Sequence, residues 1–211
     1  MRPRLRVVVA LAVLVIVAAA CSSAAEPEKT FEQPQQRVDT GPGCDHIVAS
    51  EGKRFRNVAK SFVLEYLVEA SVTPTVCYDE ISFVFDPGDG PDLPPAYTVE
   101  YKKPPFVEGI NTTTEGFKEA KAYLYIEFQP TATVDRRFAG SGRLTYRGNQ
   151  RLALEPRRPV KIVEWLKDYE DPTPEDLTDD KVIWVIGVDE KRPFTVDSAN
   201  QPPRVNVIVM R

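Results

Sequence analysis

Short runs in which apolar side chains recur at every second position follow one another from about residue 62 to the C-terminus. In the run 80–86, for example, Ile81, Phe83 and Phe85 share one face. Because successive side chains of a strand point to opposite faces, this period of two predicts half-buried β-strands. We predict strands at residues 62–68, 80–86, 97–101, 122–128, 160–165, 182–188, 193–196 and 205–209.

Residues that favour turns separate these runs. Asp86–Pro91 and Pro104–Pro105 each follow a predicted strand, and proline accounts for 19 of the 211 residues. Proline breaks helix interiors, so this content disfavours a helical bundle. Only residues 115–121 and 174–177 have helical character, and both stretches are short. The pattern therefore predicts an all-β fold over residues 44–211, a sandwich or a barrel, and we take a single β-sandwich as the expected form.

The N-terminus has a different character. Three arginines, Arg2, Arg4 and Arg6, precede Val7–Ala20, an uncharged run of 14 residues. A membrane-spanning helix needs roughly 18 or more apolar residues, so the run fits the apolar region of a signal peptide better. We expect residues 1–20 to be a signal peptide.

The sequence Ala18–Ser23, AAACSS, resembles the lipobox of bacterial lipoproteins. The resemblance implies cleavage before Cys21 and attachment of diacylglycerol to its sulfur. Acyl chains would then hold the protein on the extracytoplasmic face of the bacterial cell membrane. The alternative is an ordinary signal peptide that happens to have a cysteine nearby. In either case we expect residues 21–43, which are rich in Ser, Ala, Glu, Gln and Pro, to form a flexible tether.

Charge and composition exclude several classes of function. The net charge is -4, and removal of a signal peptide with three arginines and no acidic residue makes it -7. Binding to nucleic acid requires a basic surface, so no nucleic-acid partner is expected. His46 is the only histidine, which leaves no multi-histidine metal site. No glycine-rich nucleotide loop, C-x-x-C or G-x-S-x-G motif is found, and we predict neither a cofactor nor a metal.

Two cysteines remain besides Cys21. Cys44 and Cys77 would most simply form a disulfide in an exported protein. Two buried thiols are the alternative.

Tyrosines at alternating positions are the candidate binding face. Tyr97 and Tyr101 share one face of a predicted strand, and Tyr123 and Tyr125 share one face of another. Aromatic rings exposed on a sheet can stack on sugar rings or on partner side chains. The alternative is a second buried face, covered by a loop.

The segment 136–158 is irregular and rich in arginine. Arginine forks suit carboxylates and phosphates, so the segment could bind an anion or a polymer. Alternatively, it is a solvated loop whose charges offset those of an acidic domain. The arginines concerned are Arg136, Arg137, Arg143, Arg147, Arg151, Arg157 and Arg158.

The order of these segments from about Val72 to the C-terminus resembles the AMIN-like domain of secreted and lipid-anchored actinobacterial proteins. The matching pieces are CYDEISFVF at 77–85, PAYTVEY at 95–101, AYLYI at 122–126, VIWVIGVD at 182–189, RPFTV at 192–196 and PRVNVIV at 203–209. The chain departs from the family pattern in the arginine-rich insertion after Asp135 and in Asn206, where an apolar residue is more usual. The related AMIN domain is a non-catalytic β-sandwich that targets proteins within the envelope, where it is thought to bind peptidoglycan or partner proteins. The resemblance carries over no ligand-binding residues.

These observations lead to three hypotheses. In the first, the protein is a non-catalytic, lipid-anchored envelope protein whose AMIN-like domain binds cell-wall polymer (peptidoglycan) or an envelope protein. In the second, it is a carbohydrate-active hydrolase of the cell wall that uses a pair of acidic residues such as Asp179–Asp180 or Asp189–Glu190. In the third, it is a structural or client-binding lipoprotein.

Overall fold

A computed structural model describes residues 44, 49, 54–57, 63–106, 115–137, 142–155, 157–169 and 180–211. The expected signal peptide, the lipidation site Cys21 and the tether all lie outside the described residues, as does the stretch 174–177. In the part of the chain that is described, no helix is long and apolar enough to cross a membrane.

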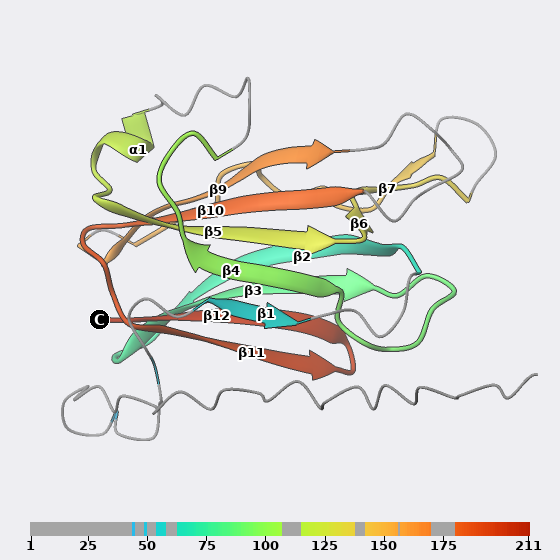
Figure 1. The fold of residues 1–211 in the computed structure, drawn as a ribbon, viewed down its shortest axis with the longest axis horizontal. Coiled ribbons are helices and arrows are strands. Elements are labelled where there is room, and N and C mark those ends of the chain that lie inside the picture. Colours follow the sequence, from blue (N-terminus) through green and yellow to red (C-terminus); the bar gives the residue numbers. More distant parts are fainter. Residues whose placement is uncertain are drawn as a thin grey trace, which may run out of the picture. The chain divides into compact units, whose positions relative to one another are not determined.

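Two five-stranded sheets contain most of the strands (Figure 1). The first sheet is antiparallel throughout, in the order β1 (Phe55–Asn57), β4 (Ala96–Tyr101), β5 (Ala122–Gln129), β10 (Lys181–Val188) and β9 (Val160–Tyr169). The second has the order β11 (Phe194–Asn200), β12 (Pro203–Met210), β3 (Tyr78–Asp86), β2 (Glu65–Pro74) and β6 (Thr131–Ala132), and only its β2–β6 pair is parallel. A small hairpin joins β7 (Val134–Asp135) to β8 (Arg143–Leu144), and α1 (Glu115–Lys118) is a single helical turn.

The main core lies between the two sheets. Phe83 of β3 packs against rings from the opposite sheet, with ring centroids 5.1 Å from Phe128 and 5.3 Å from Trp184. Apolar residues from strands of both sheets join this one buried cluster. Burial of apolar area is the dominant favourable term in folding, so this cluster is what holds the two layers together. The predicted all-β sandwich is confirmed.

The first sheet also buries apolar side chains on its other face. Tyr125, Ile162 and Val185 form a second cluster there, beneath Phe106 and Phe117, the latter from α1. At Gly187 a Cβ atom would lie 2.6 Å from Ile162 Cγ2 and 2.7 Å from Ala120 Cβ, so only glycine fits beneath this cover. A covered outer face explains the continuous apolar run of β10, whose residues 182–188 are all buried.

Candidate functional site

A carboxylate interrupts the apolar face of β3. Burial alternates along the strand, and Asp79 is buried in phase with Ile81, Phe83 and Phe85. Asp79 is directly opposite Pro74 of β2, two positions from the pair formed by Ile81 and Val72. Asp79 therefore points between the sheets, at the end of the core, and only 1% of its surface is exposed.

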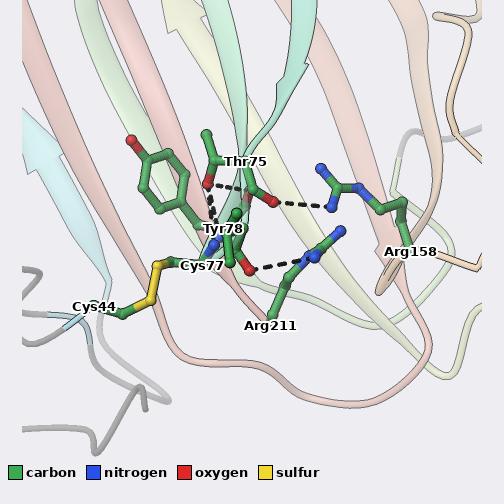
Figure 2. The surroundings of a disulfide bond; sticks show 7 residues. Cys44, Thr75, Cys77, Tyr78, Arg158 and Arg211 are labelled. Atoms are coloured by element: carbon green, nitrogen blue, oxygen red, sulfur yellow. Dashed lines mark hydrogen bonds between the residues drawn. A yellow bond between two sulfur atoms is a disulfide. The ribbon is translucent and has the colours of Figure 1, made fainter. Parts of the chain in front are cut away.

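The cation that meets this carboxylate comes from the loop that leads into the other sheet. Arg158 immediately precedes the proline that leads into β9, and it is 7% exposed. Its Nε lies 2.9 Å from Asp79 Oδ1, and its Nη1 donates a hydrogen bond of 2.9 Å to the carbonyl oxygen of Thr75. Figure 2 shows the guanidinium reaching the turn between β2 and β3. One side chain thus connects the two layers at this end of the sandwich.

A cavity of about 280 Å³ adjoins this ion pair. Five of its lining residues are apolar and three are charged. The lining residues are Val72, Pro74, Asp79, Ala153, Leu154, Glu155, Arg158 and Val160. Ala153 and Glu155 are exposed and lie at the rim. The volume is just below the range of about 300–1,000 Å³ that is usual for ligand sites, enough for one small molecule.

The charged residues of the cavity differ in exposure. Burial raises the pKa of the Asp79 carboxyl, whereas Arg158 and the backbone of Val160 act to lower it. Both Asp79 oxygens and Arg158 Nε are out of reach of solvent, and none of these atoms has a well-directed hydrogen-bond partner among the described residues. The Glu155 side chain, by contrast, is 63% exposed, and its Oε2 lies 3.7 Å from Arg158 Nε. Arg158 and the exposed Glu155 both line the cavity, whereas the Asp79 carboxylate oxygens are closed to solvent.

A disulfide fixes the hairpin that carries Asp79. Cys44 and Cys77 are bonded, with a Cα–Cα distance of 5.8 Å, which is a usual separation. Their predicted pairing is confirmed in the structure. The Thr75 hydroxyl accepts hydrogen bonds from the backbone N–H groups of Cys77 and Tyr78, and Arg211 donates to the carbonyl of Val76 (Figure 2). The turn is thereby held from several directions.

The four candidate tyrosines do not form one binding face. Each pair does share a face, as predicted, but the two pairs lie on opposite sides of the first sheet. Tyr97 and Tyr101 are opposite Phe128 and Leu124 in the β4–β5 ladder, so they face the main core. Tyr123 and Tyr125 belong to the outer cluster instead.

The tyrosine hydroxyls make internal contacts. Tyr101 Oη donates to the carbonyl of Arg192 and accepts from its N–H, at 2.7 and 2.8 Å. Tyr123 Oη donates to the carbonyl of Phe117 at 2.8 Å, and Tyr125 is only 5% exposed. The prediction of an exposed aromatic face is wrong, because Phe106 and the α1 residue Phe117 cover the outer side. The alternative, a second buried face, is the arrangement observed.

At least four of the seven arginines in segment 136–158 have acidic partners within the domain. Arg137 pairs with Asp135 at 2.8 Å and with Asp89 at 2.9 Å, and Arg151 pairs with Glu164 at 2.7 Å. Arg143 also approaches Asp135, and Arg158 meets Asp79. These pairs favour the interpretation in which the segment offsets the acidic charge of the domain. They weigh against a single anion-binding patch.

Of the acidic pairs considered from sequence, Asp189–Glu190 is the one that the structure describes in full, and its two side chains share a cation. Asp189 and Glu190 both pair with Arg192, at 3.1 and 2.9 Å. Asp180 is buried, and Asp179 lies outside the described residues. Two acidic residues that sequence reasoning missed, Asp79 and Glu155, line the cavity instead. Asp79 had a signal, because it continues the alternation of Ile81, Phe83 and Phe85 onto the apolar face.

Within the described ranges, no group of three or more His, Cys, Asp or Glu side chains could hold a metal ion. No family model, curated protein or solved structure matches this chain.

Proposed function

We propose that the protein is a non-catalytic, lipid-anchored envelope protein whose β-sandwich binds cell-wall polymer, peptidoglycan, or a protein of the envelope. The observation that carries this proposal is the cavity beside the Asp79–Arg158 ion pair. The lipobox-like sequence before Cys21 and the resemblance to AMIN-like domains support the location and the class.

The cavity has the properties of a recognition site. Its lining contains no hydroxyl, thiol, imidazole or amine side chain, so the candidate nucleophiles among its lining residues are the carboxylates of Asp79 and Glu155. Asp79 and Arg158 neutralise each other, which leaves a weakly charged site with an apolar wall. Such a site can hold and orient a ligand by hydrogen bonds and apolar contact.

Retention on purified cell wall tests this function. The variant Cys21→Ser gives a chain without the proposed lipid, which can be mixed with insoluble wall material and sedimented. We expect the protein to sediment with the wall, or to capture an envelope protein from a membrane extract. If neither occurs, the proposed function is wrong. Expression of the unaltered chain and of Cys21→Ser in an actinobacterial host tests the anchor, since the variant should leave the membrane fraction.

A wall hydrolase is the second candidate, because two carboxylates line one cavity. Glycoside hydrolysis needs a general acid and a second carboxylate across the scissile bond, and the raised pKa of Asp79 suits an acid. The inaccessibility of both Asp79 oxygens weighs against it. Release of soluble glycan fragments from the wall, lost in Asp79→Asn and in Glu155→Gln, would favour the hydrolase over the binding module.

A further inference from the structure

We propose that the cavity beside Arg158 binds the end of a glycan chain, through a pair of neighbouring sugar hydroxyls. This inference rests on the proposed function and names the part of the polymer that the site would take.

The charges at the cavity favour a neutral ligand. The buried carboxylate of Asp79 already compensates the Arg158 guanidinium, so an anionic ligand would gain little and would meet Glu155 at the rim. A cationic ligand would have to approach the guanidinium closely, since Glu155 Oε2 is only 3.7 Å from Arg158 Nε. The adjacent charges of Arg158 and Glu155 therefore favour neither an anionic nor a cationic ligand.

The other two charged residues of the lining, Arg158 and Glu155, place a donor group next to an acceptor group. Arg158 provides N–H groups only, and ionised Glu155 accepts only. A ligand that satisfies both needs an acceptor and a donor a few ångströms apart. Two hydroxyls on adjacent ring carbons meet this requirement, because each hydroxyl can both donate and accept.

The rest of the cavity suits the body of a sugar ring. Val72, Pro74, Leu154 and Val160 supply an apolar wall against which the C–H groups of a ring can pack. The volume of about 280 Å³ suits one monosaccharide rather than an extended chain.

This size and polarity together select a chain end. In a 1,4-linked glycan of N-acetylated hexosamines, the linkage uses the C4 hydroxyl of each internal residue. Only the residue at the non-reducing end keeps neighbouring free hydroxyls at C3 and C4. We therefore infer that the site recognises this terminal residue.

Titration of the Cys21→Ser chain with N-acetylglucosamine, followed by ¹H–¹⁵N NMR, tests the inference. We expect shifts of the Arg158 Nε–H signal and of the backbone amides of residues 153–155. The 4-O-methyl derivative, acetate and ethylammonium are the comparison ligands, and we expect each to bind at least tenfold more weakly. Equal binding of the 4-O-methyl derivative, or shifts only at other residues, would overturn the inference.

Two variants test the cavity without disturbing the buried ion pair. Glu155→Gln replaces an exposed carboxylate by an amide of the same shape, and loss of one charged hydrogen bond should weaken binding about tenfold. Ala153→Trp places an indole at the rim and should abolish the shifts. The control is Leu144→Trp, which adds the same side chain at an exposed position outside the cavity lining. Unchanged affinity in Ala153→Trp would contradict the inference.

The wall assay separates this inference from the proposed function. If the chain sediments with wall but the sugar does not bind in the cavity, the inference fails and the proposed function stands. If the sugar binds but neither wall nor an envelope protein is retained, the proposed function fails.

Discussion

The guanidinium of Arg158 meets the carboxylate of Asp79 at 2.9 Å, and both side chains are almost completely buried. Asp79 belongs to β3 of one sheet and Arg158 to the loop that leads into β9 of the other, so this contact connects the layers where the apolar core ends. Buried pairs of this kind contribute little net stability, but removal of one partner leaves an uncompensated charge in the interior.

We therefore predict that Arg158→Met destabilises the domain by about 3–5 kcal/mol, as estimated for a broken buried pair. The measurement is the free energy of unfolding in urea. The double variant Asp79→Leu/Arg158→Met removes both charges and should recover most of the loss. A double variant that is no more stable than Arg158→Met would show that the ion pair is not what the single substitution disrupts.

The Cys44–Cys77 disulfide is expected to contribute to stability. Its sequence separation is 33 residues, for which loop closure predicts a contribution of about 3–4 kcal/mol. Cys44→Ser/Cys77→Ser should lose this amount in urea unfolding, and a reductant should shift the wild-type curve to the same position. Addition of reductant to the double variant serves as the control and should change nothing. A wild-type curve that does not respond to reductant would contradict the disulfide.

Glu65 should make stability fall as the pH rises. Burial raises the pKa of its carboxyl from 4.5 to about 8, so the folded state keeps the proton over a range in which the unfolded state releases it. The contribution is complete below about pH 4.5 and decreases up to about pH 8, by about 1.4 kcal/mol per pH unit. The check is the free energy of unfolding at several pH values for wild type and for Glu65→Gln.

Glu65→Gln should show a flatter dependence on pH, with the gap between the two proteins widest above about pH 8. Parallel curves for the two proteins would mean that Glu65 titrates normally in the fold.

Tyr101 is predicted to act in stability rather than in ligand binding. Tyr101→Phe removes a hydroxyl that both donates to and accepts from the backbone of Arg192, which should cost about 1–2 kcal/mol. Retention on cell wall should be unchanged at a temperature where the variant is folded. If Tyr101→Phe is as stable as wild type but is no longer retained on cell wall, Tyr101 takes part in ligand binding after all.

Alternation along the chain predicts the long strands well, since each has one face in the main core. It predicts less where the ladder is irregular or short. A register shift between Leu67 and Glu69 interrupts the period of β2, so the predicted strand ends at residue 68 whereas the observed one continues to Pro74. Two-residue strands such as β6 and β7 are too short to show any period.

The candidate site depends on contacts between residues far apart in the sequence, and the local alternation of apolar residues cannot predict such contacts. Alternation places Asp79 on the apolar face, but its partner Arg158 is 79 residues away in a segment without periodicity. The tyrosine prediction failed for the same reason. The alternation of β5 shows that Tyr125 is opposite the core, but the rings that cover it, Phe106 and Phe117, come from outside the predicted strands.

The Cys44–Cys77 bond also determines where a pulling force would enter the domain. If lipid holds the chain at Cys21, tension from the membrane passes through Cys44 into the β2–β3 turn instead of first peeling away the edge strand β1. The 23 peptide steps from Cys21 to Cys44 can span at most about 80 Å. The cavity is lined by Pro74 and Asp79, which flank this turn. The length of residues 21–44 would therefore also limit the distance between the cavity and the membrane. The cavity would then contact only the layer of wall nearest the membrane.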